Sequence, residues 1–174
     1  RCPVSLRPAD RWAMVIMSTQ RTMPGGRAVR SELPKGIAGR ALCRWCSVEV
    51  PRGRRTFCSD WCVHEWRLRS DPGYLRQQVF ARDRARCALC RIDATEAFRR
   101  LKSSRGASRK TMLEYWGLKS ITRKSLWDAD HILPVCEGGG ECDLKNIRTL
   151  CLACHRDVTW QLRRRLRTGT MLAC

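Results

Sequence analysis

Long apolar runs are missing from this sequence, and so is a nucleotide-binding loop. The longest apolar run near the start, Trp12–Met17, is too short for the core of a signal peptide, and no segment approaches the roughly 20 apolar residues of a membrane span. No GxxxxGK(S/T) phosphate loop occurs, which excludes an ATPase motor of that type from this chain. We therefore expect an intracellular protein without membrane contact, located in the cytoplasm of a microbe or in the nucleus of a eukaryote.

Acidic residues are also scarce. The 174 residues contain 16 Asp and Glu against 35 Lys and Arg, which gives a formal net charge of +19. Such a surface attracts polyanions, and the phosphate backbone of nucleic acid is the commonest of them. A basic face that only contacts solvent is the alternative. Because the arginines are clustered as well as numerous, we expect a nucleic-acid partner.

The chain length fits one or two small domains with a modest core. Residues 1–37 are rich in Arg, Pro, Gly and Ser without a sustained period, which is typical of a disordered basic arm. A mistranslated leader, with the natural start at Met17 or Met23, explains this segment equally well. We expect a zinc-binding module over residues 38–70, a second domain over residues 71–168 and a short tail over residues 169–174.

Cysteine is abundant, with 12 residues, and eight of these stand in four closely spaced pairs. In an intracellular protein, such pairs are typical of metal ligands rather than of disulfides. Two short turns can direct four thiolates to one tetrahedral zinc ion. The alternatives are that these cysteines are buried free thiols, or that His64 replaces one of them as a ligand. The first predicted zinc site consists of Cys43, Cys46, Cys58 and Cys62.

The second group of cysteines brackets the middle of the chain. Its two CxxC pairs are further apart than in the usual zinc ribbon, so their spacing alone supports a shared ion less strongly. A zinc clamp here would hold an upstream helix against a strand and the last helix. Cys136 and Cys142 flank a glycine turn, and we expect them to pack or to serve as reserve ligands. The second predicted zinc site consists of Cys87, Cys90, Cys151 and Cys154.

The pattern of capping residues and apolar positions predicts an α+β domain. Strands are predicted over Trp127–Val135 and at the end of the segment 142–151, with a glycine turn between them. Residues 103–125 are interpreted as a basic insertion. Helices are predicted over residues 72–84, 94–102, 112–116 and 154–167.

Apolar side chains at helical spacing predict which faces are buried. In the helix that begins at Pro72, Leu75, Val79 and Phe80 are expected to face the core. For Tyr115 and Trp116 we favour packing in the core over stacking on a nucleic-acid base. In the last helix, the buried stripe is expected to consist of Val158, Leu162 and Leu166.

Polar residues between the CxxC pairs suit phosphodiester cleavage. The carboxylate of Asp130 and an imidazole nitrogen of His155 can hold a divalent ion and leave positions open for water and a phosphate oxygen. His131 can accept a proton from water near neutral pH. Asn146 carries a donor and an acceptor, so it can fix a loop or orient the histidine. Asp128, on the same strand face as Asp130, is a rival or additional ligand.

The sequence DADHILPVCEGGGECDLKNIRTLCLACHRDVT, residues 128–159, resembles the motif of the HNH endonuclease family. Asp130 and His131 match the Asp-His start of that motif. Asn146 matches its central asparagine, and His155 matches its final histidine. Because four positions in three separate places agree, the resemblance is specific.

The likeness extends over roughly residues 37–160. There the layout is similar to the nuclease end of annealing helicase/endonucleases of the zinc finger, RAN-binding type, and to stand-alone microbial HNH proteins. It implies a ββα-metal fold on a treble-clef-like zinc scaffold, with Mg²⁺, Mn²⁺ or another divalent ion at the active site. It also implies His131 as the general base, Asp130 and His155 as ligands of that ion, and Asn146 as the orienting residue.

Together these observations predict a metal-dependent DNA endonuclease with one catalytic divalent ion and two structural Zn²⁺ sites. A partner chain would supply any motor or targeting function. A non-catalytic zinc module that binds DNA or a protein is the alternative, but such a module has no chemical need for all four site residues. The expected phosphate contacts are Arg148, Arg156, Arg163, Arg164, Arg165 and Arg167.

Overall fold

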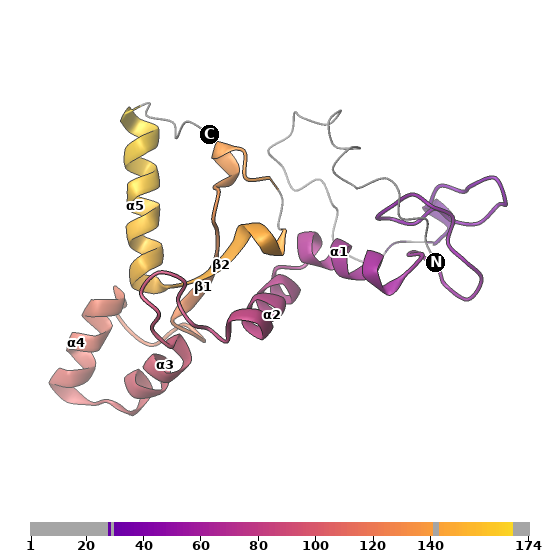
Figure 1. Ribbon diagram of the computed structural model, residues 1–174. Helices are drawn as coiled ribbons and strands as arrows, with labels where there is room; N and C mark the ends of the chain where they lie inside the picture. The colour runs from indigo at the N-terminus through magenta and orange to yellow at the C-terminus, as the bar shows by residue number, and fades with distance from the viewer. Residues whose placement is uncertain (1–27, 29, 141–142, 169–174) are drawn as a thin grey trace. The chain divides into compact units, whose positions relative to one another are not determined.

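The computed structural model describes residues 28, 30–140 and 143–168 (Figure 1). Most of the predicted basic arm, the predicted tail and Cys142 lie outside these ranges. The chain divides into two compact units, Arg1–Pro72 and Gly73–Cys174, and each is described by itself. Within the described ranges, no helix combines the length and the apolar composition needed to span a bilayer.

The first unit contains the predicted cysteine module. It includes a 3-10 helix, Arg30–Glu32, two isolated β-bridges and the helix α1, Asp60–Ser70. Ser59 caps α1, because its hydroxyl accepts a hydrogen bond from the backbone N–H of Cys62 at 3.2 Å. Among the described residues, the buried cluster around the cysteines of this unit consists of Cys43, Val50 and Cys62, with Trp45 and Phe57 packed against it. A core this small needs an additional cross-link, which four thiolates and a metal ion provide.

The second unit has three helices followed by two strands and a long helix. The strands form an antiparallel two-stranded sheet in which Ala129 lies opposite Thr149. This mixture of helices and one small sheet confirms the α+β class, and its last three elements have the predicted order strand, strand, helix (Figure 1). The elements are α2 Pro72–Asp83, α3 Ala94–Ser103, α4 Gly106–Trp116, β1 Trp127–His131, β2 Ile147–Cys151 and α5 Leu152–Thr168.

The helices α2 and α3 form where local signals predict them. Pro72 opens α2, since its fixed φ suits a first turn, and the helix buries Leu75 and Val79. Asp93 caps α3, because its carboxylate accepts hydrogen bonds from the N–H groups two and three residues later, at 2.9 and 3.0 Å. The fully buried side chains of this unit include Val79, Leu101, Leu126, Ile147 and Leu150.

Some exposed aromatic side chains contradict the sequence-based expectation. Phe80 is 40% exposed and lies at the rim of the core, where it stacks on Trp127 with ring centroids 6.2 Å apart. Trp116 is buried as expected, but Tyr115 is 56% exposed, because consecutive helical residues point in different directions. The helix that carries them, α4, begins at Gly106 and not at residue 112.

The strand β1 is shorter than predicted and ends at His131 instead of Val135. Beyond His131, the N–H of Ile132 donates to the backbone oxygen of Asn146 at 2.8 Å, and Pro134 has no N–H with which to continue a ladder. Backbone pairing with the second strand therefore ends before Pro134.

The predicted buried stripe of α5 is wrong at Leu166 and only partly formed at Val158 and Leu162, which are half-buried. Within the described part of this helix, burial is confined to Leu152 and Ala153, and Leu166 is 50% exposed. Size explains the difference. The helix has 17 residues and is about 25 Å long, whereas each strand has 5 residues and is about 17 Å long. The sheet therefore cannot cover the C-terminal half of α5.

Candidate metal and catalytic site

Both predicted groups of four cysteines come together in the structure. In each group, the four sulfur atoms all lie within 4.8 Å of one another. In the first group, Sγ of Cys58 is 3.4 Å from Sγ of Cys46 and 3.4 Å from Sγ of Cys62. A tetrahedron with Zn–S bonds of about 2.3 Å has edges of about 3.8 Å, so these separations suit one zinc ion. His64 does not belong to either group.

The second group joins three parts of its unit. Cys87 and Cys90 lie in the turn between α2 and α3, Cys151 ends β2, and Cys154 lies in the first turn of α5. Burial raises the pKa of Cys87, but hydrogen bonds from backbone groups, chiefly at Cys151, outweigh it and lower that pKa to about 6. Burial raises the pKa of Cys151 to about 11. A cation is therefore needed to ionise the whole group near neutral pH.

His155 lies between two carboxylates of β1. Its Nε2 is 3.7 Å from Oδ1 of Asp130, and its Nδ1 is 3.5 Å from Oδ2 of Asp128. The two aspartates share a strand face because they are two residues apart. Two metal–ligand bonds of about 2.1 Å each can span the distance from Oδ1 of Asp130 to Nε2 of His155. These two atoms can therefore bind one divalent ion. Asp128 faces the other ring nitrogen and is placed to orient the imidazole.

Arginine side chains partly neutralise both carboxylates. Arg148 donates from Nε and Nη2 to Oδ2 of Asp130 at 3.2 and 3.1 Å. Arg123 donates to Oδ1 of Asp128, and Nη1 of Arg76 lies 3.5 Å from the same oxygen. Linear spacing does not reveal these pairs. The register of the sheet, in which Asp130 lies opposite Arg148, is the signal that identifies the first of them.

His131 is the last residue of β1. Its Nε2 is buried and has no hydrogen-bond partner among the described residues. Such an atom is unusual, because leaving a buried polar group unpaired costs roughly 1–3 kcal/mol. The hydrogen-bonding capacity of this atom is therefore not used by the described residues. The structure brings Asp130 and His155 together, but in the described ranges it shows no hydrogen bond or ion pair from His131 to either of them.

Asn146 holds the loop that follows β1. Its Oδ1 accepts a hydrogen bond from the N–H of Leu133 at 2.8 Å. Its Nδ2 donates to the backbone oxygens of Leu133 at 3.0 Å and Gly139 at 2.7 Å. Gly139 has no room for a side chain, since a Cβ there would overlap the backbone of Leu133. Of the two roles considered for Asn146, these contacts support fixing the loop.

The predicted phosphate-contact arginines of α5 are not equivalent. Arg165 forms an ion pair with the nearly buried Glu137, whose Oε1 lies 3.2 Å from Nη2, so it ties α5 to the loop after β1. Arg156 is exposed and its Nη2 lies 3.5 Å from the backbone oxygen of Tyr115. The remaining three are also exposed: Arg163, Arg164 and Arg167.

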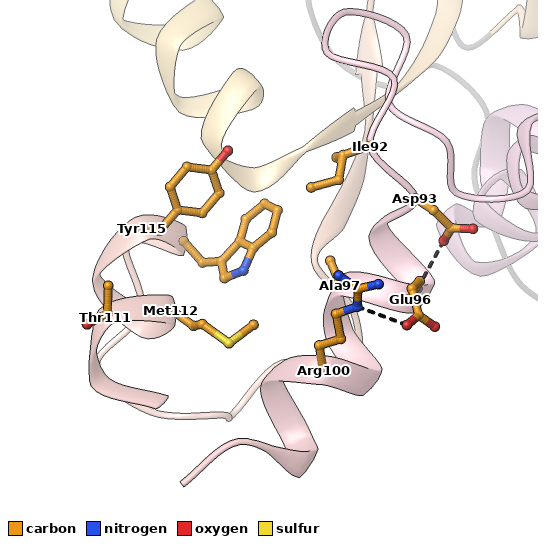
Figure 2. Close-up of a pocket in the computed structure, with 9 residues that line it drawn as sticks. Ile92, Asp93, Glu96, Ala97, Arg100, Thr111, Met112 and Tyr115 are labelled. Carbon is orange, nitrogen blue, oxygen red and sulfur yellow. Dashed lines mark hydrogen bonds and ion pairs between the residues drawn. The ribbon is translucent and has the colours of Figure 1, made fainter. Parts of the chain in front are cut away.

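A shallow cavity of about 550 Å³ lies elsewhere in this unit, between α3 and α4. Figure 2 shows Met112 and Tyr115 on one side of it and Ala97 and Arg100 on the other. Its lining is mainly apolar, and its two acidic residues are engaged: Glu96 with Arg100 at 3.0 Å, and Asp93 with backbone N–H groups of α3. The cavity therefore lacks the set of polar ligands that the aspartates and His155 present.

Comparison with known sequences identifies a family for the region that contains these residues. Residues 118–160 match the family model described as HNH endonuclease. The match covers both strands of the sheet and the beginning of α5. It therefore includes the two aspartates, His131, Asn146 and His155.

The relatives are longer than this chain. The protein named "DNA annealing helicase and endonuclease ZRANB3" from Mus musculus is 35% identical over 144 residues, which are 71% of this chain and 14% of that protein. Its Homo sapiens counterpart is 36% identical over 115 residues, which are 59% of this chain and 11% of that protein. The crystal structure of the human ZRANB3 HNH domain is 34% identical, with 57% of this chain and 97% of that domain covered and a TM-score of 0.42.

Proposed function

Because this chain belongs to the HNH endonuclease family, we propose that it is a metal-dependent DNA endonuclease that hydrolyses phosphodiester bonds. The observation that carries the proposal is the placement of His155 Nε2 at 3.7 Å from Asp130 Oδ1, within a segment that matches the family. The basic composition supports a nucleic-acid substrate.

The proposed metal ligands are Asp130 and His155. Arg148 holds Oδ2 of Asp130, which leaves Oδ1 turned toward the imidazole. Asp128 faces Nδ1 of His155, so a proton is retained on Nδ1 and the Nε2 lone pair is directed toward Asp130. A bound Mg²⁺, Mn²⁺ or similar ion would stabilise negative charge on the phosphate and on the leaving oxygen.

His131 is the proposed general base. Its unpartnered Nε2 accepts a proton from water as the water oxygen bonds to phosphorus in line with the leaving group. The bond from phosphorus to the 3′ oxygen breaks, and that oxygen takes a proton from solvent. The expected products are a 5′-phosphate and a 3′-hydroxyl. Asn146 keeps the loop after His131 in place during this step.

The two groups of cysteines are proposed to hold structural zinc. The group at the start of α5 fixes Cys154, and the adjacent His155 is thereby positioned. Exposed arginines of α5 would contact phosphates, with Arg148 able to share its guanidinium between Asp130 and DNA. The names of the relatives combine an annealing helicase with an endonuclease, which supports a partner chain or a further segment as the source of a motor.

The test is a nicking assay on supercoiled DNA. Brief EDTA treatment should stop cleavage without unfolding the protein, because an ion with two protein ligands exchanges more readily than zinc held by four thiolates. Added Mg²⁺ or Mn²⁺ should restore it. His131→Ala should abolish nicking while zinc content and DNA affinity stay near those of the parent protein.

His64→Ala is the matched control, since His64 lies outside both cysteine groups, and it should cleave normally. Cleavage by His131→Ala, or cleavage that survives EDTA, would contradict the proposed mechanism. If EDTA removes folded structure, DNA binding and activity together, a non-catalytic zinc module becomes the better account.

A further inference from the structure

Trp160 is an exposed tryptophan on α5. Its side chain is 60% exposed, whereas Trp66, Trp116 and Trp127 are each at most 7% exposed. Among the described residues, its recorded ring interaction is with Arg164, whose guanidinium carbon lies 5.6 Å from the ring centroid. Its large apolar surface therefore does not contribute to the core, and packing does not explain why it is there.

Arginines surround Trp160 on the same side of the helix. With 3.6 residues per turn, positions three, four and seven residues away share a face with a given residue. All four arginines at such positions are exposed, and the acidic Asp157, three residues before Trp160, lies on the same face. We call this group the Trp160 face: Trp160, Arg156, Arg163, Arg164 and Arg167.

The Trp160 face begins next to the proposed catalytic site. Arg156 directly follows His155, and Trp160 lies about 7.5 Å further along the helix axis than His155 and about 140° around it, so Trp160 and His155 point in different directions from α5. From Arg156 to Arg167 the face is about 16 Å long, which corresponds to about five nucleotides at 3.4 Å each. DNA held at Asp130 and His155 therefore reaches this face by passing around α5 at Arg156.

An aromatic ring flanked by guanidinium groups suits unpaired nucleotides better than duplex. In a duplex the base faces are covered by their neighbours, so only the arginines would find partners. In a single strand the base faces are free, and stacking on an aromatic side chain adds to phosphate contacts without regard to sequence. An exposed tryptophan has no function in a purely phosphate-binding surface.

We infer that the Trp160 face binds an unpaired stretch of the DNA substrate, with one base stacked on Trp160 and its phosphates paired with the arginines. The inference rests on the proposed function for the identity of the nucleic acid. It adds a substrate preference: a duplex with a single-stranded extension beside the scissile phosphate should bind more tightly than a blunt duplex of the same length.

The test uses oligonucleotides with 2-aminopurine placed along a single-stranded tail, because the fluorescence of this base falls when it stacks. Binding is measured with the zinc-loaded full chain and no added Mg²⁺, so that the DNA stays intact. For the parent protein we expect quenching at one or two tail positions. Trp160→Ala should remove that quenching and weaken binding to the tailed duplex roughly 5- to 150-fold, the range expected for one stacked base.

Two further variants serve as controls. Trp160→Phe keeps an aromatic ring and should retain most of the quenching and affinity. Leu166→Ala removes an exposed apolar side chain from a different face of the same helix and should change neither. Blunt-duplex binding should be almost unaffected by all three substitutions.

The inference is overturned if Trp160→Ala binds the tailed duplex as the parent does, or if it weakens blunt and tailed duplexes equally. Binding to tails without any quenching in the parent protein would also overturn it. The nuclease proposal fails separately: a parent protein that does not cleave under any divalent ion, yet shows Trp160-dependent quenching, binds unpaired DNA without being an active nuclease.

Discussion

Replacing Thr149 with valine should measurably destabilise the sheet that carries the site. Thr149 is fully buried in β2, and its hydroxyl donates a hydrogen bond of 2.8 Å to Oδ2 of Asp83 at the end of α2. Arg82 also pairs with that carboxylate, at 2.7 Å, and donates to the backbone oxygen of Ile147 at 2.6 Å. The hydroxyl is therefore part of the connection between α2 and β2.

The expected loss follows from these contacts. A hydrogen bond to a charged group contributes about 1.5–3 kcal/mol, and the lower end applies because Asp83 keeps Arg82 as a partner. Valine has nearly the same shape as threonine, so no cavity adds to the cost. For a unit of this size, a loss of about 1.5 kcal/mol lowers the melting temperature by roughly 6–12 °C.

The pH dependence has a definite sign. Hydrogen bonding by Arg82, followed by that of Thr149, lowers the pKa of Asp83 in the folded protein. A carboxyl whose folded-state pKa is lowered stabilises the fold above its unfolded-state pKa, and this contribution disappears as the pH falls through the folded-state value. The difference in the free energy of unfolding between the parent protein and Thr149→Val should therefore be largest near neutral pH and should decrease in acid.

Urea denaturation at neutral pH with saturating zinc measures the effect. Thr111→Val is the control, because the Thr111 hydroxyl is exposed and bonds only its own helix backbone at 3.2 Å. It should change the free energy of unfolding by less than about 0.5 kcal/mol. In a protein that already carries Asp83→Ala, Thr149→Val should change the free energy of unfolding only slightly, because the hydroxyl has lost its acceptor. The reasoning is refuted if Thr149→Val destabilises the Asp83→Ala protein as much as the parent protein, or if it does not destabilise the parent protein at all.

Three other substitutions test separate parts of the unit. Cys87→Ser should lower the zinc content measured by mass spectrometry, whereas Cys136→Ser, at an exposed free thiol, should not; equal zinc contents would show that Cys87 is no ligand. Gly139→Ala should destabilise the protein by at least about 1–3 kcal/mol in chemical denaturation, because a Cβ would overlap the backbone of Leu133, and an unchanged midpoint would contradict that geometry. Asp128→Asn should weaken Mn²⁺ binding about 10- to 100-fold by electron paramagnetic resonance at constant zinc content, and unchanged Mn²⁺ affinity would rule out its positioning role.

Local signals account for the parts of the fold that the sequence predicts correctly. The cap at Asp93 and the proline at the start of α2 act within a few residues, so they are legible in a linear sequence. The cysteine groups are also predictable, because two ligands from one tight turn are close whatever the rest of the chain does. The motif residues His131 and His155 are identified differently, by their match to the family motif.

Features that depend on tertiary arrangement are not predictable in this way. The pairing of Arg148 with Asp130 depends on the register of the sheet, which the spacing of the motif does not determine. The exposure of Leu166 depends on how far the sheet extends beneath α5. The partners of Asn146 depend on the path of the loop after Pro134, and the sequence leaves that path open.

The junction between Cys154 and His155 restricts how this domain can change during evolution. One added residue between them would rotate His155 about 100° around the axis of α5 and move it about 1.5 Å along that axis. The cysteine would stay with its group, while the imidazole would leave Asp130 and Asp128. Length variation is therefore expected to be tolerated in the segment around α4, which contributes no residue to the metal site, and to be eliminated at the start of α5.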